Sequence, residues 1–266
     1  MKKRLDILLF ERGLSPSRER ARAAIMSGDV YVSGQRADKP GMSFSEDSEI
    51  ELRQDPIGFV SRGGLKLQKA LDVFGVLPEG RNVLDCGASS GGFTDCLLKR
   101  GAKRVWAIDV GYGQLAWSLR NDSRVVCMER FNVRGLTKEH VGEPVDLAVC
   151  DLSFISLRLI LPVLAQVLEA SCELVCLVKP QFEAGREAVG KGGVIREPKV
   201  HAAVLEEFGR NARDAGFAVN AVTFSPVKGP KGNIEFLAHL IRPGECAEID
   251  FGELVKETHR QMTVNR

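Results

Sequence analysis

Four charged residues each end a strand-like apolar run, at positions where they could act on a ligand: Asp85, Asp109, Asp151 and Lys179. In an open α/β sheet, ligands bind outside the carboxyl ends of the strands, so these side chains should converge on one crevice. An unpaired charge is costly to bury, which argues against a place for them in the core. Carboxylates beside an amine could orient a reacting group and give its proton a destination.

Two further charges could join this group. Glu235 lies within a strand-like run over 233–238, and its apolar neighbours indicate that it needs a basic partner. Lys66 lies at the start of an expected helix whose apolar side includes Leu67 and Leu71. For each of these charges taken singly, a structural ion pair or a solvated side chain is the alternative interpretation.

The turn after the first strand-like run is rich in glycine. Residues 85–94 read DCGASSGGFT, and a helix and a second strand ending at Asp109 follow. Strand, glycine-rich turn, helix and a strand ending in an acid are typical of nucleotide-binding βαβ units. The spacing D-x-G-x-x-x-G-G differs from the dinucleotide pattern G-x-G-x-x-G, and no P-loop pattern is present. A tight turn without a ligand is the structural alternative.

The acid before this turn indicates which ligand would suit it. Asp85 would repel a pyrophosphate, whereas it suits an amine such as the methionine end of S-adenosylmethionine. Asp109 would then hold the ribose hydroxyls. Beyond residue 60, strand-like runs alternate with helical patterns, which indicates a parallel α/β sheet that would position all of these residues.

The first part of the chain has a different character. Residues 1–39 carry nine basic and five acidic residues, although the whole chain has a net charge of only +2. That balance excludes a uniformly basic surface but not a local basic patch. Two helices are expected here, the second capped by Ser15 with Pro16 and ended by Gly28. A short strand at 30–32 and a tight turn at 33–35 should follow.

Composition excludes several classes of protein. The chain has 266 residues and seven cysteines, none with CxxC spacing. This usage is typical of reduced thiols in a cytosolic protein and suggests no metal site. No stretch approaches the ~18 apolar residues that a membrane-spanning helix requires. We therefore expect a soluble cytoplasmic protein.

The first part resembles the alpha-L RNA-binding domain, first known from a small-subunit ribosomal protein. The features that carry the resemblance are Arg4-Leu5-Asp6, Gly13-Leu14, Ser17-Arg18, the run 28–32 (GDVYV), Gly34 and Lys39-Pro40. A solvated basic face is the alternative interpretation. Together with two basic residues of the second part, the expected RNA contacts are Arg4, Arg18, Arg20, Arg22, Lys39, Arg62 and Lys191.

The second part resembles the FtsJ-type RNA ribose 2′-O-methyltransferases. The order Lys66, Asp151, Lys179, Glu235 matches the lysine-aspartate-lysine-glutamate tetrad of that family. The surrounding runs narrow the resemblance to the TlyA family, which joins an alpha-L domain to an FtsJ-like domain. These runs are 60–64 (VSRGG), 85–95 (DCGASSGGFTD), 109–115 (DVGYGQL), 132–134 (NVR), 151–157 (DLSFISL), 178–183 (VKPQFE) and 190–194 (GKGGV).

The resemblance implies a fold, a site and a reaction. The fold would be a Rossmann-like S-adenosylmethionine-dependent methyltransferase sheet with a small N-terminal α+β RNA-binding domain. The expected divisions are residues 1–55, a linker at 56–60, the methyltransferase domain at 61–245 and a C-terminal tail or helix at 246–266. The catalytic residues would be the tetrad, and the cofactor site would comprise Asp85, Gly87, Ser89, Gly91, Gly92, Phe93, Thr94, Asp109, Val110, Asn132 and Asp151.

The implied reaction is methylation of a cytidine ribose 2′-hydroxyl in 23S rRNA, with 16S rRNA as an additional target of some members. The partner would be the large ribosomal subunit, and for such members the small one. Lys179 could act as the base, or it could position the hydroxyl and stabilise developing charge. A non-catalytic ribosome-binding factor is the main rival hypothesis. Membrane lysis is a third, disfavoured by the lack of a suitable apolar segment.

Three features outside the motifs give secondary expectations. The segment 183–197 is interpreted as a mobile basic loop over the RNA, with a plain glycine-rich connection as the alternative. The run 228–232 (KGPKG) is interpreted in the same way. His201 is expected to be a surface residue at the start of a helix.

Overall fold

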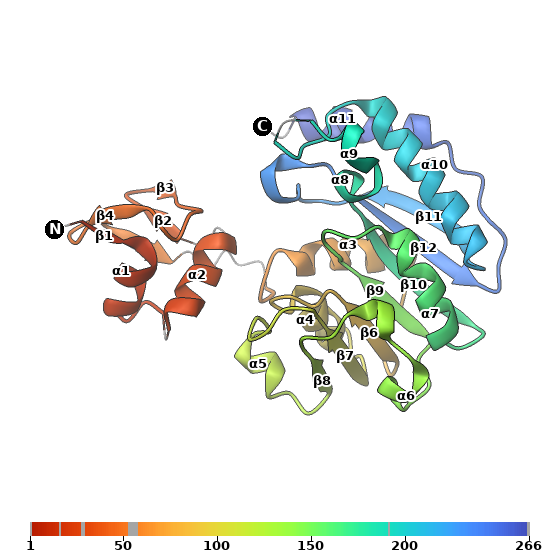
Figure 1. Cartoon of the computed structure of the whole chain (residues 1–266), viewed down its shortest axis with the longest axis horizontal. Coiled ribbons are helices and arrows are strands. Elements are labelled where there is room, and N and C mark those ends of the chain that lie inside the picture. The colour runs from red at the N-terminus through yellow and green to blue at the C-terminus, as the bar shows by residue number, and fades with distance from the viewer. Residues whose placement is uncertain (1, 16, 28–29, 53–57, 191, 265–266) are drawn as a thin grey trace. The chain divides into compact units, whose positions relative to one another are not determined.

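The structure is a computed structural model that describes residues 2–15, 17–27, 30–52, 58–190 and 192–264. The chain forms two compact units, Met1–Arg62 and Gly63–Arg266, and Figure 1 shows the elements of both. The linker expected at 56–60 lies partly outside the described residues.

The N-terminal unit combines two helices with short strands. Its elements are β1 (Lys2–Arg4), α1 (Leu5–Glu11), α2 (Arg18–Ser27), β2 (Val30–Val32), β3 (Gln35–Arg36), β4 (Ser43–Ser45) and β5 (Ile50–Leu52). Strands β1 and β4 form one sheet, and β3-β2-β5 form another. Leu5, Leu9, Ala21 and Ile25 of the two helices are fully buried and form the core with the strand residues Val30 and Val32. This small core explains why the helices pack together.

Two local expectations in this unit can be compared with the structure. The tight turn is confirmed, because Ser33 and Gly34 both have positive φ between β2 and β3. The expected cap at Ser15 is wrong: the backbone N–H of Arg20 donates to Ser17 Oγ (3.2 Å), whereas Ser15 Oγ donates to Ser17 O. Pro16 and Gly28 lie outside the described residues.

The C-terminal unit alternates helices with the strands of one large sheet. Its helices are α3 (Gly63–Phe74), α4 (Gly92–Lys99), α5 (Trp117–Arg120), α6 (Lys138–Val141), α7 (Leu161–Val167), α8 (Pro180–Glu183), α9 (Gly185–Ala188), α10 (Pro198–Asp214), α11 (Phe251–Val264) and the 3-10 helices η1 (Val133–Gly135), η2 (Leu157–Leu159) and η3 (Pro230–Gly232). Its strands are β6 (Asn82–Cys86), β7 (Arg104–Ile108), β8 (Val125–Met128), β9 (Leu147–Cys150), β10 (Cys172–Val178), β11 (Ala218–Phe224) and β12 (Phe236–Arg242).

The sheet is mixed, not wholly parallel as the alternation of runs predicted. Its seven strands lie in the order β11-β12-β10-β9-β6-β7-β8. Strands β8, β7, β6, β9 and β10 pair in parallel. Strand β12 is antiparallel to both β10 and β11. Parallel and antiparallel buried strands have the same apolar pattern, so the sequence did not distinguish them.

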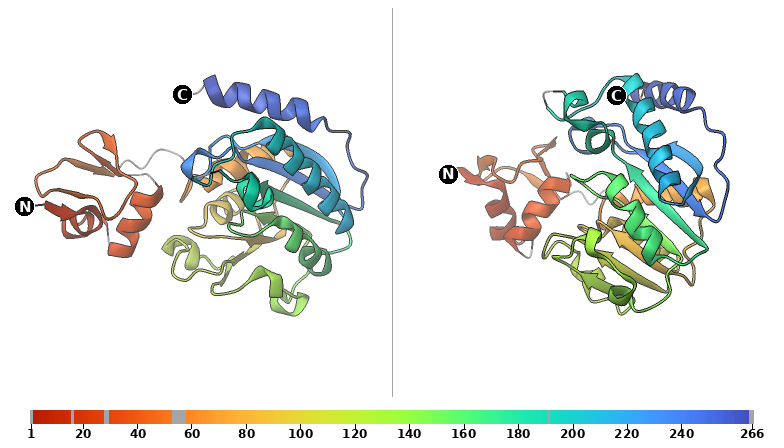
Figure 2. Two further views of the ribbon diagram at one scale, coloured as in Figure 1. Left: turned by 45° about the horizontal axis from the view of Figure 1, so that its top comes forward. Right: turned by 45° about the vertical axis from the view of Figure 1, so that its right-hand side comes forward.

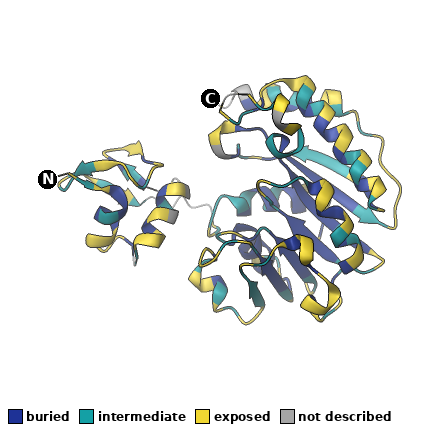
Figure 3. Ribbon diagram, in the orientation of Figure 1, coloured by how far each residue is buried: buried dark blue, intermediate teal, exposed yellow. Residues whose placement is uncertain are grey.

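Both faces of the sheet are covered by helices (Figure 2), and its central strands are buried between them (Figure 3). Alternate strand residues point to opposite faces. Leu84, Ala148 and Leu174 belong to a core cluster that also contains buried residues of α7, α10 and α11. Val83 and Val175, which are next to Leu84 and Leu174 in their strands, point to the opposite face and are also fully buried. Helices α3 and α4 pack together on that face.

The residues at the end of the chain form a helix that packs on α10. Val255, Thr258 and Met262 of α11 are buried. Opposite them, His201 of α10 is fully buried, and its Nδ1 lies 2.8 Å from His259 Nε2 of α11. The expectation that His201 is a surface residue is therefore wrong.

The segment expected to be a basic loop is partly helical. It begins within α8 and continues through α9, with Lys191 outside the described residues. Glu183 at its start accepts hydrogen bonds from Ser156 Oγ (2.6 Å) and from the backbone of Leu157 (2.9 Å). Asn233 holds the far end by accepting from the backbone N–H of Ile195 (3.0 Å). These bonds fix one end of the segment to η2 and the other to the loop before β12.

Candidate active site

The topology places the charged residues of the motifs at one edge of the sheet. Asp109 and Asp151 follow the parallel strands β7 and β9, and Lys179 follows β10. Glu235 directly precedes the antiparallel strand β12, whose first residue pairs with the last residue of β10. Glu235 is therefore outside the strand in which the sequence placed it. Because β12 runs the opposite way, its start lies at the edge where β10 ends.

Lys179 is the centre of one polar cluster. Its Nζ lies 2.6 Å from Asp151 Oδ1 and donates a hydrogen bond to Ser153 Oγ (2.8 Å). Only 7% of the residue is exposed. A lysine ammonium has three donors, and these two contacts account for two of them. Asp151 and Ser153 thus fix the position of the lysine ammonium.

Lys66 and Glu235 form a second, more deeply buried pair. Lys66 lies on α3, and its Nζ donates to Glu235 Oε2 at 2.6 Å. Glu235 is fully buried, so the basic partner expected for it is present. The backbone at Gly229 lies directly over this carboxylate, because a Cβ at that position would be 2.0 Å from Glu235 Oε1. The four residues of the tetrad therefore form two lysine–carboxylate pairs.

The glycine-rich turn is shaped by close packing within the protein. Gly87 has φ +93°, and a Cβ there would lie 2.5 Å from the carbonyl oxygen of Asp151. At Gly91 a Cβ would lie 2.2 Å from a side-chain carbon of Leu119. Because glycine has no Cβ, the turn can pass close to Asp151 and Leu119. The sequence analysis had suggested a different role for these glycines, the close approach of a ligand.

Asp109 is held in place by the same turn. Its Oδ2 accepts a hydrogen bond from the backbone N–H of Ser89 (2.8 Å), and its Oδ1 accepts one from Gly111 (2.7 Å). Each carboxylate oxygen can accept further hydrogen bonds, so the carboxylate remains able to bind hydroxyl groups. The next residue, Val110, is 69% exposed and offers an apolar surface beside it. Asn132 is exposed and accepts from the backbone N–H of Arg134 (3.1 Å).

Asp85 is enclosed within the protein. Thr94 Oγ1 donates to Asp85 Oδ2 at 2.6 Å, while Oδ1 has no hydrogen-bond partner among the described residues. Desolvation raises the pKa of Asp85 to about 7, although the hydrogen bond from Thr94 opposes the shift. Asp85 is fully buried, and its contact with an amine stays a prediction. Its neighbours Gly92, Phe93 and Thr94 are buried in the first turn of α4.

Comparison with known proteins relates this geometry to one family. Residues 59–242 match the FtsJ-like methyltransferase family, and residues 3–50 match the S4 domain. The chain is 48% identical to a Mycobacterium tuberculosis protein named 16S/23S rRNA (cytidine-2′-O)-methyltransferase TlyA, across 89% of each chain. This chain belongs to the TlyA family of FtsJ-like methyltransferases.

Other TlyA-like proteins carry a different name. A Brachyspira hyodysenteriae protein called Hemolysin A is 44% identical over 90% of this chain and 99% of its own. A solved structure of a proposed hemolysin from Streptococcus thermophilus has a TM-score of 0.80 and 45% identity, covering 99% of this chain and 98% of its own. The seven-stranded sheet and the matches to the FtsJ-like methyltransferase family and the S4 domain confirm the predicted fold class. Among the described residues, no helix has the length and apolar character needed to cross a membrane.

The basic residues expected to contact RNA have different surroundings. Arg4, Arg18 and Arg22 all donate to Asp6, which is fully buried. Arg20 and Lys39 are exposed, and Lys191 lies outside the described residues. Arg62 is partly buried. The basic run at 228–232 is anchored at its start, because Lys228 Nζ donates to the carbonyl oxygen of Met262 (3.0 Å).

Two residues close to Lys179 were not expected from the sequence. Phe154 is 90% exposed and has φ +64°, a backbone conformation rare for a large side chain. Its ring lies 5.1 Å from that of Phe182, whose centroid is 5.9 Å from Lys179 Nζ. Ser153 is the other missed residue. Their position directly after Asp151, in the run 151–154, was the available signal.

Proposed function

We propose that this TlyA-family protein transfers the methyl group of S-adenosylmethionine to the 2′-hydroxyl of a cytidine ribose in 23S rRNA. The observation that carries the proposal is the ion pair between the buried Lys179 and the partly exposed Asp151 at the edge of a methyltransferase sheet. The substrate is inferred from the printed name of the M. tuberculosis relative, which specifies cytidine, the 2′-oxygen and rRNA. Ribosomal RNA lies in the cytoplasm, which is where the enzyme would act.

The described residues fit the proposed cofactor. Asp109 would accept hydrogen bonds from the ribose hydroxyls, since its carboxylate is fixed by Ser89 and Gly111. Val110 would face the adenine ring, and the Asn132 side chain would bind its polar edge. When bound, S-adenosylmethionine supplies an electrophilic methyl group on a sulfonium. We infer that Asp85 supports this site indirectly, through its hydrogen bond to Thr94.

Because the cofactor supplies the reactive methyl group, the protein itself must position and activate the ribose hydroxyl. Such a hydroxyl is a weak nucleophile, so it must lie in line with the methyl group and lose its proton. Lys179 has one N–H left beyond its contacts with Asp151 and Ser153, and this donor would bind the ribose oxygen. As the ribose oxygen accepts the methyl group from the sulfonium, its proton would leave through the Lys179–Asp151 pair or to solvent.

Lys66 would act beside this centre as a second cation. Glu235 fixes its ammonium at 2.6 Å, and the residue is 8% exposed. A fixed ammonium suits the sugar and phosphate oxygens of the target nucleotide. We assign Glu235 a positioning role, because the fully buried carboxylate touches Lys66 and not the solvent.

The exposed ring of Phe154 suggests how the target base would be held. In structured RNA, a target nucleotide must leave the base stack before its reacting atom can enter an active site. Aromatic side chains stabilise such an unstacked base by stacking on it. Phe154 offers its ring to solvent near Lys179, with Phe182 supporting it. We therefore place the target base on Phe154, while the S4 unit binds rRNA elsewhere.

A methyl-transfer assay with ribosomal subunits tests the proposal. Purified protein would be incubated with labelled S-adenosylmethionine and with separate unmethylated large and small subunits. The proposal predicts label in large-subunit rRNA and none with Lys179→Ala, while that variant still binds RNA. Label in both subunits would identify a two-target enzyme. Tight subunit binding by the wild-type protein without any methyl transfer would support the rival ribosome-binding factor.

A further inference from the structure

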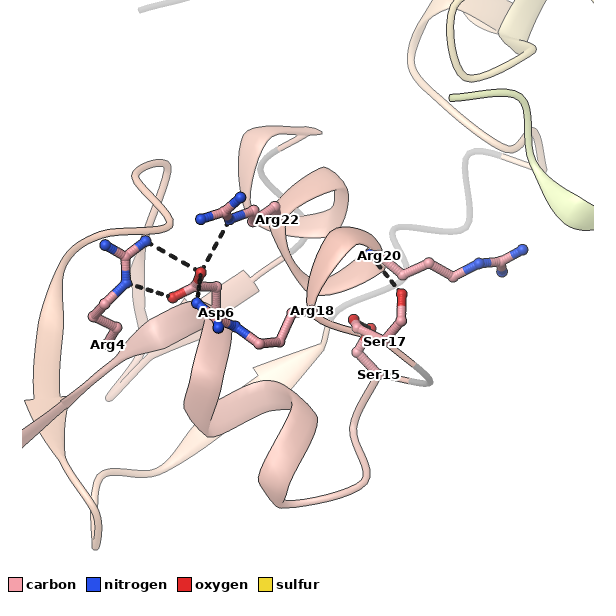
Figure 4. A network of polar contacts seen from close by, with 7 residues as sticks. All are labelled: Arg4, Asp6, Ser15, Ser17, Arg18, Arg20 and Arg22. Carbon is pink, nitrogen blue, oxygen red and sulfur yellow. Dashed lines mark hydrogen bonds and ion pairs between the residues drawn. The ribbon is translucent and has the colours of Figure 1, made fainter. Parts of the chain in front are cut away.

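The N-terminal unit contains a carboxylate shared by three arginines, shown in Figure 4. Arg4 Nε donates to Asp6 Oδ1 at 2.9 Å, and its Nη2 donates to Oδ2 at 3.1 Å. Arg18 Nη2 and Arg22 Nε also donate to Oδ2, at 3.2 and 3.0 Å. The arginines come from the end of β1 and from two successive turns of α2, so one carboxylate joins three places in the unit.

Burial differs sharply between the carboxylate and the arginines. The side chain of Asp6 is fully buried, whereas 44%, 47% and 51% of the Arg4, Arg18 and Arg22 side chains are exposed. Hydrogen bonds from Arg4, and then from Arg22 and Arg18, hold the pKa of Asp6 well below its usual range despite its burial. The cluster thus has a buried negative centre and an exposed positive rim, with a formal charge of about +2.

Each arginine keeps hydrogen-bond donors for an external ligand. A guanidinium carries five N–H groups, and Asp6 takes one or two from each arginine. Within the described part of the chain, the groups left over by Asp6 include Nη1 of Arg4, Nε and Nη1 of Arg18, and both Nη atoms of Arg22. Guanidinium edges held in fixed positions match the oxygens of phosphates, which accept paired N–H donors.

We propose that Asp6 is a positioning residue that fixes Arg4, Arg18 and Arg22 as one binding site for phosphodiester oxygens of RNA. The proposal deepens the proposed function and rests on its RNA substrate. Flexible arginines must be ordered when they bind, whereas those bound to Asp6 are ordered beforehand. Arg20 differs from them, because its side chain points away from Asp6 in Figure 4.

The charge of Asp6 makes the proposal testable, because positioning and simple electrostatics predict opposite changes in RNA affinity when Asp6 is replaced. Asp6→Asn removes a negative charge from an RNA-binding surface, so electrostatics alone predicts tighter binding. Positioning predicts weaker binding, since the arginines lose the carboxylate that holds them. Glu19→Gln is the matched control, because Glu19 is exposed on α2, takes no part in the cluster, and its loss changes the net charge equally.

The measurement is the affinity of full-length protein for transcribed 23S rRNA between about 50 and 200 mM KCl, concentrations over which phosphate contacts weaken measurably. We expect Asp6→Asn to weaken binding by about tenfold or more, and Glu19→Gln to leave it unchanged or slightly tighter. Equal or tighter binding by Asp6→Asn would overturn the proposal.

A second variant covers the case in which Asp6→Asn does not fold, which circular dichroism would reveal. Arg22→Lys keeps the charge but loses the Nε contact and the planar guanidinium edge. We expect it to weaken binding severalfold, and unchanged affinity would overturn the proposal. These binding results are independent of methyl transfer, so the positioning role can hold even if the proposed reaction fails.

Discussion

At the scale of single residues, the sequence predicted which side chains matter better than it predicted how they pair. Charges that end apolar strands pointed to Asp151 and Lys179, and an acid among apolar residues pointed to a basic partner for Glu235. The pairing of Glu235 with Lys66 joins residues 169 positions apart, and spacing alone does not define such a contact. Asp6 was identified only as part of the run that resembles the alpha-L domain, and its burial under three arginines was not predicted.

Substitution of Lys179 distinguishes its two possible roles. Lys179→Ala should lower the rate of methyl transfer by at least ~10²-fold, because it removes either a base or a fixed donor. Lys179→Arg keeps a charged donor but cannot accept a proton at neutral pH. Single-turnover rates should therefore be equally low in both variants if Lys179 is the base, and higher in Lys179→Arg if it positions the hydroxyl. Activity of Lys179→Ala close to wild type would contradict both roles.

Asp85 should make stability depend on pH. Burial raises its pKa in the folded protein to about 7, above that of an unfolded chain. Between the unfolded and folded pKa values, the folded state binds more protons than the unfolded state. The contribution of protonated Asp85 to the free energy of unfolding is therefore complete below about pH 4 and is lost as the pH rises through about 7. The Asp85→Asn variant cannot ionise at this position. Chemical denaturation should show that this variant gains stability relative to wild type by a few kcal/mol between about pH 5 and pH 8.

An exposed acid provides the control for this measurement. The control substitution is Asp38→Asn, which removes an exposed carboxylate from the other unit. If the difference between Asp85→Asn and wild type were the same at pH 5 and pH 8, the raised pKa would be refuted.

At the scale of elements, the strands and the turn were largely predictable, and the direction of one strand was not. Alternating apolar runs located β6, β7, β9 and β10, because buried strands leave a strong signal. The reversal of β12 leaves no such signal, yet it brings Glu235 to the edge where Lys179 lies. His201 could have been found, since it shares the apolar face of α10 with Val204, Leu205 and Phe208.

The loop before β12 should be sensitive to a single added methyl group. A Cβ at Gly229 would overlap Glu235 Oε1, so Gly229→Ala must displace the carboxylate or the loop. We expect lower methyl transfer and a loss of about 1–3 kcal/mol of stability. Gly135→Ala is the control, because nothing lies within 4 Å of a Cβ there. Full activity of Gly229→Ala would show that Glu235 need not occupy its present position.

The contact between α10 and α11 should weaken in acid. Desolvation lowers the pKa of His201 to about 4, so the folded state resists its protonation. Stability from the neutral ring is present above the ordinary histidine pKa of about 6.5 and is lost as the pH falls toward 4. His201→Gln should reduce the loss of unfolding free energy between pH 7 and pH 5. An unchanged loss in this variant would exclude His201 as its source.

At the scale of the whole molecule, the sequence predicted two parts with different functions. The resemblance of the first part to the alpha-L domain predicted an RNA-binding unit. The alternating runs of the second part predicted an α/β sheet, and its resemblance to the FtsJ-type enzymes predicted catalysis there. The structure forms two compact units, and the family matches give one the S4 domain and the other the FtsJ-like methyltransferase. The packing of α11 on α10 was not predicted, because its buried residues meet a partner about 50 positions earlier in the chain.

The identity of the methylated nucleoside tests the central claim most directly. Ribosomal RNA would be recovered after incubation with the protein and S-adenosylmethionine, digested to nucleosides and examined by mass spectrometry. The account predicts 2′-O-methylcytidine with the wild-type protein and its absence with Lys179→Ala. A methyl group on the cytosine base, on a different nucleoside, or on none at all would contradict it.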